Sequence, residues 1–362
     1  MTHDEYWYWL CSINGLSPYM KKCLIQEFDS PEEIYEAKPA EIIKRTGLKA
    51  EFADAFTAEK DKDLIQRGFE KLQKNNVGFI SIDNVRFPAR LKQIDDCPLC
   101  LYIKGNLPDE NRPTIGMVGA RACSGYGREY ALKFSRALAL KGVQIVSGMA
   151  VGIDSICAGG AIEMNGATFA VLGSGIDVIY PRDNIELYYQ IIAAGGGVIS
   201  EYPPGTPPLA WQFPHRNRLI AGLSDRLIVI EAGKRSGTLS TAMHALDQGK
   251  EVYALPGRAN DRLSRGCNEL IKDGAGMLTG VEEFMEESGL DKYISVPGAC
   301  IPEGSKVPET PGLLSFMGYE PIGIKELSEK SGLPASEVLG KLSELELDGL
   351  IERVSGTFYA RR

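Results

Sequence analysis

Histidine, long apolar runs and positive charge are all scarce in this sequence. Only 3 histidines occur among the 362 residues, too few and too dispersed for a histidine cage around a metal ion. No segment approaches the roughly 18 consecutive apolar residues of a membrane span. Acidic residues outnumber basic ones, and the net charge of -8 excludes a broadly basic coat for nucleic acid. A site for a polyanion must therefore be a local patch, and we expect no metal, no cofactor and no membrane partner.

A secretion signal and a disulfide pattern are also missing. The N-terminal residues include acids but no lysine or arginine, which argues against a signal peptide. The 8 cysteines are scattered over the chain, as is typical of reduced thiols in the cytoplasm. Cys97 and Cys100 have the spacing of metal ligands, but no second pair of cysteines or histidines accompanies them. We expect them to pack beside a strand at 101–103, with a zinc or redox role as the alternative.

Four segments can be distinguished along the chain. The first has the apolar spacing of short helices, with Ser30 and Pro31 as a typical helix start, and is similar to sterile-alpha-motif and helix-hairpin-helix domains. Its Asn14-Gly15 turn lacks the paired glycines of a DNA-gripping hairpin, which favours a packing role. The predicted boundaries are 1–75 for this helical domain, 76–292 for a sheet domain, 293–312 for a linker rich in proline and glycine, and 313–362 for a winged-helix-like domain.

The last segment has the pattern of two helices followed by a hairpin. One helix is predicted around 324–332, a second opens at Pro334, and Ser355-Gly356 has the composition of a hairpin turn. A helix that enters the major groove needs cations near the phosphates. The second helix instead carries four acids against one lysine, namely Glu337, Glu344, Glu346 and Asp348 against Lys341. Protein contact or simple packing is therefore favoured over duplex binding.

The sheet segment alternates short apolar strands with helical patterns. Leu227–Ile230 is typical, because an apolar run without polar alternation indicates a strand buried on both faces of a parallel sheet. The alternation predicts an α/β fold, an extended Rossmann-like and mostly parallel sheet with helices on both faces. The predicted strands are 115–118, 144–147, 168–172, 198–200, 227–230 and 252–255, and the predicted helices include 128–140, 185–193 and 238–248.

Glycine-rich segments follow four of these strands, at 119–127, 147–154, 173–177 and 233–238. Ligands bind such sheets at the carboxyl ends of the strands, so four loops of this kind indicate one binding edge. The last loop opens a helix at Thr238, and free backbone N–H groups at a helix start bind phosphate.

Arginines and aromatic residues accompany these loops. Arg121, Arg216 and Arg218 carry guanidinium groups, which bind phosphate bidentately. Phe213 and His215 lie beside the arginine pair, and aromatic rings are the surfaces on which the bases of a single strand stack. These residues favour a polymer of phosphates over a single nucleotide as the ligand.

The spacings of nucleotide-binding enzymes are absent. The glycines after 119 fall at 125 and 127 rather than in G-x-G-x-x-G, and Ser147-Gly148 replaces the acidic residue that would hold a ribose. No G-x-x-x-x-G-K-[ST] occurs either. Asp154 is at least as well interpreted as a helix cap, and Glu231 as the anchor of a neighbouring loop. No recognisable catalytic arrangement arises from the candidates, which are Asp154, Asp177, Glu201, Glu231, His215 and His244.

Six ordered motifs cover the sheet segment: SGMAVGID (147–154), VLGSGIDVIYPRDN (171–184), ISEYPPGTPP (199–208), FPHRNRLIAGLS (213–224), SGTLSTAMHAL (236–246) and a run at 254–275. In these motifs the chain resembles the DNA-processing protein A family, also called Smf. The resemblance implies a non-enzymatic protein that binds single-stranded DNA, protects it after uptake in natural transformation and helps to load the RecA recombinase. It also implies an extended Rossmann-like fold and a homodimer.

The resemblance assigns positions as well. Arg121 would contact phosphate, and the dimer surface would include Ile271 and Met277, although that stretch also has the composition of ordinary core. Together with the other loop residues, the predicted DNA-binding set is Gly119, Arg121, Ser147, Gly148, Gly173, Ser174, His215, Arg216, Asn217, Arg218, Lys234, Ser236, Gly237 and Thr238.

A nucleotide-processing enzyme is the alternative. Lysine-decarboxylase-like phosphoribohydrolases have this type of sheet and a Pro-Gly-Gly-x-Gly-Thr loop followed by a glutamate. Gly237-Thr238 matches that loop, but residues 239–242 offer no carboxylate, which argues against nucleotide hydrolysis. A pure protein adaptor would leave the clustered arginines unexplained. We therefore expect a binding protein rather than an enzyme.

Overall fold

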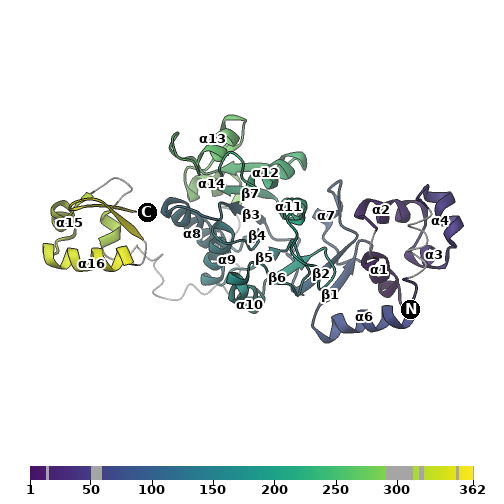
Figure 1. The fold of residues 1–362 in the computed structure, drawn as a ribbon. Coiled ribbons are helices and arrows are strands. Elements are labelled where there is room, and N and C mark those ends of the chain that lie inside the picture. Colours follow the sequence, from purple (N-terminus) through teal and green to yellow (C-terminus); the bar gives the residue numbers. More distant parts are fainter. Residues whose placement is uncertain (14–15, 50–58, 291–312, 318–321, 348–349, 362) are drawn as a thin grey trace.

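The computed structural model describes residues 1–13, 16–49, 59–290, 313–317, 322–347 and 350–361 (Figure 1). The expected linker at 293–312 and the Asn14-Gly15 turn lie outside the described residues. In the described part of the chain, none of the helices combines the length and the apolar character that crossing a bilayer requires.

Short helices form the N-terminal segment. Ser30 caps α3 as expected, since its hydroxyl accepts from the Glu33 N–H at 3.2 Å and Pro31 takes the first helical position. The tryptophans of α1, Trp7 and Trp9, are buried in a cluster that extends to Tyr102 in the sheet. Figure 1 shows these helices beside β1 and β2, so this segment packs on one end of the sheet. The helices are α1 (His3–Ser12), α2 (Pro18–Glu27), α3 (Pro31–Glu36), α4 (Pro39–Thr46) and α6 (Lys62–Lys74).

The centre of the fold is a sheet that has nine strands among the described residues, in the order β1-β2-β6-β5-β4-β3-β7-β8-β9. The pairs from β6 to β9 are parallel, while β1 and β2 form an antiparallel extension. The expected Rossmann-like, mostly parallel sheet is therefore confirmed. The strands are β1 (Gly78–Ser81), β2 (Cys100–Gly105), β3 (Thr114–Gly119), β4 (Gln144–Ser147), β5 (Thr168–Val171), β6 (Gly197–Ser200), β7 (Arg226–Ile230), β8 (Glu251–Ala254) and β9 (Gly276–Met277).

Helices cover both faces of the sheet, which explains why its strands are apolar throughout. Ile228 and Ile230 of β7 belong to one core with α8, α9 and α14, while Leu227 and Val229 belong to another with α7, α11, α12 and α13. Helix α10 packs on the same face as α9. The bounds are α7 (Ala89–Lys92), α8 (Gly125–Leu140), α9 (Ile153–Glu163), α10 (Ile185–Ala193), α11 (Gln212–Leu223), α12 (Thr238–Asp247), α13 (Arg265–Lys272) and α14 (Val281–Glu287).

The C-terminal module has the winged-helix arrangement that the sequence predicts. Helices α15 (Ile324–Ser331) and α16 (Ala335–Leu347) pack on a small sheet in the order β10-β12-β11. Its strands are β10 (Ile322–Gly323), β11 (Ile351–Ser355) and β12 (Phe358–Arg361). Leu327, Val338, Leu342, Ile351 and Tyr359 form its core.

Candidate nucleic-acid interface

The carboxyl ends of β3 and β7 border a cavity of about 630 Å³, which we call the strand-end groove. Helix α11 and the start of α12 contribute to its walls. Half of the predicted DNA-binding set lines it: Gly119, Arg121, Arg216, Asn217, Ser236, Gly237 and Thr238. Further lining residues include Asp154, Tyr180, Pro208, Ala210, Phe213, Gly233, Thr241 and Leu263.

Gly119 lets the backbone segments around the groove approach one another. A Cβ atom at this position would lie 1.9 Å from the carbonyl oxygen of Ile230 and 2.6 Å from the side chain of Ile153. The Thr238 hydroxyl also donates to the Gly119 carbonyl oxygen at 2.9 Å. Any side chain at 119 would separate β3 from β7, so this position requires glycine.

Arg216 places a buried positive charge in the wall of the groove. Only 5% of the residue is exposed, and its guanidinium donates to the carbonyl oxygens of Gly148, at 3.1 Å, and Val171 rather than to a carboxylate. Burial lowers the pKa of Arg216 to about 10, with Asp154 nearby opposing that shift. The side chain therefore remains charged at neutral pH, and its desolvated charge attracts an anion more strongly than a charge in water does.

An aromatic ring lies close to two guanidinium groups at this site. The guanidinium carbons of Arg121 and Arg216 are each 5.9 Å from the ring centroid of Phe213. Tyr180, which is 42% exposed, lies 5.4 Å from the same ring between centroids. A Cβ atom at Gly173 would lie 2.9 Å from Phe213, so Gly173 makes room for the ring. The groove thus combines cations with surfaces on which bases can stack.

The start of α12 differs from the expectation of free backbone donors. The N–H of Thr238 donates to the Ser236 hydroxyl at 3.2 Å, and the N–H groups of Leu239 and Ser240 donate to carbonyl oxygens of the same turn. Asn217 donates to the Gly237 carbonyl oxygen at 3.3 Å and to Ser240 at 2.8 Å. The expectation is therefore wrong for these three N–H groups, because the tight Ser236–Gly237 turn satisfies them internally. The loop contributes shape and the Ser236 and Thr238 hydroxyls.

Arg218 and His215 lie away from the groove. Arg218, 4% exposed, donates to Glu201 at 2.6 Å and to Asp96 at 2.9 Å. His215 contacts the same two carboxylates, with Nδ1 at 3.0 Å from Glu201 and Nε2 at 3.3 Å from Asp96. These hydrogen bonds, to Asp96 first and Glu201 second, raise the pKa of His215 to about 9. The two residues belong to an ion network that connects α11 to β6 and to the loop before β2.

The remaining predicted residues make contacts within the fold or lie outside the lining of the groove. The Ser147 hydroxyl donates to the Met117 carbonyl oxygen at 2.7 Å, and that of Ser174 donates to Val178 at 2.7 Å. Gly148 lies against Arg216, since a Cβ there would be 2.7 Å from its guanidinium. Lys234 is exposed and pairs with Glu269 at 3.2 Å. The structure does not bring Ser147, Gly148, Gly173, Ser174 or Lys234 into the lining of the groove.

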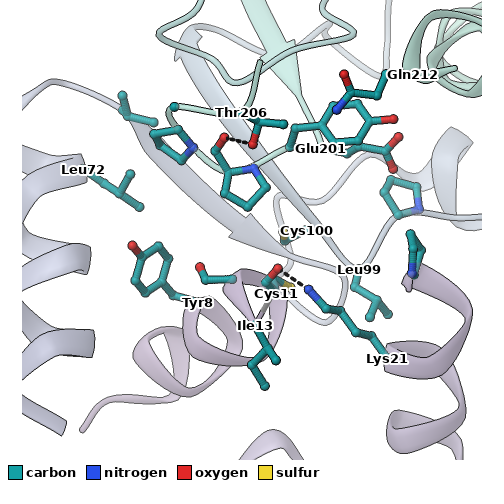
Figure 2. Close-up of a pocket in the computed structure, with 18 of the residues that line it drawn as sticks. Tyr8, Cys11, Ile13, Lys21, Leu72, Leu99, Cys100, Glu201, Thr206 and Gln212 are labelled. Atoms are coloured by element: carbon teal, nitrogen blue, oxygen red, sulfur yellow. Dashed lines mark hydrogen bonds between the residues drawn. The ribbon is translucent and has the colours of Figure 1, made fainter. Parts of the chain in front are cut away.

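A larger cavity, of about 1230 Å³, separates the N-terminal helices from the sheet (Figure 2). Tyr8 and Cys11 of α1, Ile13 directly after it and Lys21 of α2 face Glu201, Thr206 and Gln212 across the cavity. The Lys21 ammonium donates to the Cys11 carbonyl oxygen at 2.6 Å. Arg218 lines this cavity rather than the strand-end groove.

The cysteine pair also borders that cavity. Cys100 begins β2 and is buried, which confirms the expected packing at the strand, and burial raises its pKa well above the ordinary value. Burial likewise raises the pKa of Cys97 to about 11. Both thiols are therefore protonated at neutral pH and pack as apolar groups.

Carboxylates near the groove hold loops in place. Glu231 accepts from the N–H of Ser124 at 2.8 Å and from its hydroxyl, which confirms the loop-anchor interpretation. Asp154 accepts from the N–H groups of Gly148, at 3.1 Å, and Ala150, at 3.4 Å. Asp154 thus stabilises the loop that precedes α9. It is not the helix cap that the sequence suggested, because Gly152 occupies the N-cap position of α9. Of the described residues that line the groove, Asp154 alone carries a carboxylate, and burial raises its pKa.

Sequence reasoning missed the loops after β6 and β8. Pro208, Ala210 and Leu263 from these loops line the groove, and Arg262 and Arg265 lie close by. The rule that ligands bind at the carboxyl ends of strands applies equally to β6 and β8, so the same signal could have identified them.

Comparisons with known proteins place this geometry in context. Residues 78–289 match the family described as DNA recombination-mediator protein A, and residues 302–357 match the DprA winged helix domain. Protein Smf of Escherichia coli K12 is 38% identical over 328 residues, covering 89% of this chain and 87% of that protein.

Two solved structures are similar as well. DNA processing protein A of Streptococcus pneumoniae has a TM-score of 0.68 at 34% identity, covering 79% of this chain and 98% of that one. The Helicobacter pylori protein, described for its unique single-stranded DNA binding mode, has a TM-score of 0.53 at 30% identity, covering 59% of this chain and 96% of that one.

Proposed function

The chain belongs to the DNA recombination-mediator protein A family, and from that premise we propose that its strand-end groove binds single-stranded DNA without regard to sequence. The observation that carries the proposal is the pair of guanidinium groups, one buried at Arg216 and one exposed at Arg121, that lie within 5.9 Å of the centre of the Phe213 ring. Cations bind the phosphates, while Phe213 and Tyr180 offer faces to unpaired bases. A duplex keeps its bases stacked on one another and cannot use these rings.

The biological role in this proposal is that of a recombination mediator. The protein would protect incoming single strands and help to load RecA recombinase on them during natural transformation. The H. pylori relative is described as binding single-stranded DNA, which supports the ligand; the RecA step rests on family membership. Acting on these two partners, the protein would work in the cytoplasm.

Self-association is part of the proposal. Within the described part of the chain, β9 is the last strand of the sheet and pairs with β8 alone. Met277 on this strand is 51% exposed, whereas Ile271 on the preceding helix is partly buried against the core. We propose that Met277 and the edge of β9 lie in a homodimer interface, with Ile271 supporting them.

The C-terminal module is assigned to protein contact. Glu337, Glu344 and Glu346 of α16 face solvent, and Lys341 is already paired with Glu337 at 3.5 Å. An acidic helix surface repels a phosphate backbone. This favours a protein partner over duplex DNA for the winged helix, and the four-segment division of the chain stays a prediction.

A binding role is favoured over catalysis for a physical reason. The groove's carboxylate, Asp154, is buried, and its Oδ2 accepts two backbone N–H groups, so we assign it to holding the loop after β4 rather than to activating water. Residues 239–242, at the start of α12, carry no acid that could take its place. A phosphoribohydrolase remains the second candidate only because the Gly237-Thr238 loop is present.

Fluorescence anisotropy tests the proposal. Labelled oligo-dT and a duplex of equal length are titrated with the full chain at low and moderate salt. We expect preference for the single strand and weaker binding as salt rises, because phosphate contacts release counterions. Equal affinity for the duplex, or no binding at low salt, would refute it. Release of base or phosphate from nucleoside monophosphates should stay at background.

A further inference from the structure

A third cavity, of about 880 Å³, adjoins the strand-end groove on the side of β8. The two cavities share Gly233, Ser236 and Leu263 in their walls, so they form one continuous depression along the sheet edge. We call this third cavity the basic groove. Its lining residues are Gly233, Lys234, Arg235, Ser236, Asn260, Asp261, Arg262, Leu263 and Arg265.

The parallel sheet brings the two walls of the basic groove together. Strands β7 and β8 are neighbours and run in the same direction, so the loops that follow them leave the sheet at the same edge. The Gly266 N–H donates to the Ala232 carbonyl oxygen at 2.7 Å, which joins the two loops directly. Asn268 holds the second loop by bonds to the Gly257 N–H, at 3.2 Å, and carbonyl oxygen, at 3.0 Å. These bonds give the groove a defined shape before any ligand arrives.

Positive charge is concentrated in this groove although the chain as a whole is acidic. Arg235, Arg262 and Arg265 are exposed, and none of the three forms an ion pair within the described ranges. The one acid in the lining, Asp261, accepts from the Leu263 N–H at 3.0 Å and the Ser264 hydroxyl at 3.1 Å. The groove therefore has three exposed arginines and one carboxylate that is already hydrogen-bonded within its own loop. This excess of positive charge makes a local site for a polyanion.

The chemistry of the basic groove differs from that of the strand-end groove. In the strand-end groove, Phe213 and Tyr180 lie near the cations. The described residues that line the basic groove include no aromatic ring. Guanidinium groups without a stacking surface recognise phosphate oxygens and leave bases unread. The basic groove therefore suits the backbone of a strand whose bases point to solvent.

We propose that single-stranded DNA held in the strand-end groove continues past Ser236 into the basic groove, where Arg235, Arg262 and Arg265 bind successive phosphates. This rests on the proposed function, since the strand must enter through the first groove. The basic groove is then a phosphate subsite that lengthens the bound segment and strengthens its salt dependence, and it adds no base preference.

The test compares oligonucleotides of two lengths. The full chain and the double variant Arg262→Ala/Arg265→Ala are titrated with oligo-dT of about 4 and about 16 nucleotides, the span of single-domain sites. We expect wild type to gain affinity with length and the double variant to gain much less. For the longer oligonucleotide, the slope of log affinity against log salt should fall by about 1.4 in the variant, since each single-strand phosphate contact contributes about 0.7.

Lys141→Ala is the control for the loss of a cation outside the two grooves. This exposed residue lies just before β4, at the amino ends of the parallel strands, whereas both grooves lie at their carboxyl ends. Its replacement removes one cation without changing either groove. Thermal unfolding checks that each variant folds. A double variant that gains affinity with length as wild type does, or that loses equally at both lengths, overturns the continuation into the basic groove. Wild type that binds neither oligonucleotide refutes the proposed function itself.

Discussion

Arg216 and Arg218 lie two positions apart on α11, and their guanidinium groups line two different cavities. Successive residues of an α-helix are about 100° apart around its axis, so positions i and i+2 face nearly opposite directions. Arg216 reaches the strand-end groove, while Arg218 points toward β6 and pairs with Glu201. Asn217, between them, joins α11 to the start of α12. One triplet thus supplies a cation in the wall of the strand-end groove, a connection between helices and a structural ion pair.

Arg121→Ala should weaken single-stranded DNA binding without affecting the fold. The side chain is exposed and lies over Phe213, so its loss removes a phosphate contact and leaves no buried group unpaired. We expect a loss of about 1.5 kcal/mol, roughly tenfold in Kd. Anisotropy measures the binding and thermal unfolding the stability; Lys141→Ala serves as control. Unaltered affinity would remove Arg121 from the site.

Arg218→Ala should instead destabilise the protein. Removing this side chain leaves the buried Glu201 carboxylate without its strongest partner, and breaking such a pair costs about 3 kcal/mol. Urea unfolding measures the change. The double variant Arg218→Ala/Glu201→Gln should recover part of the loss, because the unpaired charge is gone. A variant of full stability with impaired DNA binding would show that Arg218 contacts DNA after all.

His215 should make stability depend on pH in the alkaline range. Its pKa, raised from 6.5 to about 9 by Asp96 and Glu201, means that folding favours the protonated ring. The stabilisation is therefore complete below about pH 6.5 and is lost as pH rises through about 9. Urea unfolding between these values should show a decline that His215→Gln flattens. With 3 histidines in the chain, an NMR titration can check the pKa directly; a ring that titrates near 6.5 would contradict the network.

Phe213→Leu should reduce DNA affinity by removing the stacking surface. Leucine retains an apolar side chain over Gly173 but has no π-face for a base or for the two guanidinium groups. We expect a loss of about 1–3 kcal/mol, the range found for one base stacked on an aromatic residue. Phe213→Tyr keeps the ring and is the control. Equal losses in both variants would mean that the ring packs and does not stack.

Met277→Asp should weaken self-association. A charge on the exposed face of β9 is expensive to bury at an interface but costs little in the monomer, where the side chain is half exposed. Size-exclusion chromatography with light scattering over a range of concentrations gives the oligomeric state. If the variant forms a homodimer as stable as that of the wild type, the interface does not include Met277.

Most of the fold could be predicted from sequence patterns. Gln144–Ser147 and Ile185–Ala193 coincide with their predicted bounds, and the other predicted strands differ by one residue at one end or both. Strands buried on both faces are apolar throughout, and that signal is strong over short lengths. The antiparallel pairing of β1 with β2 was not foreseen, because a register with an edge strand depends on which surfaces meet.

The residues of the candidate site could be predicted only in part from the sequence. Gly119, Arg121, Arg216 and Thr238 lie together as expected, since strand ends of a parallel sheet share an edge. Arg218 and His215 do not, although they are adjacent in sequence to residues that do. A run of basic residues shows how much charge is present, but the helical rotation decides which cavity each side chain enters.

The sequence by itself determined the alternation of strands and helices, the family, and the loops that carry the arginines and glycines, because periodicity and local spacing specify these features. Only the tertiary structure decided which arginines are available to a ligand. Arg218 is neutralised by carboxylates that are 17 and 122 positions away, and Arg262 and Arg265 reach the ligand edge through the pairing of β8 with β7. Charge neutralisation and cavity lining depend on distances through space, and residues far apart in the sequence set those distances.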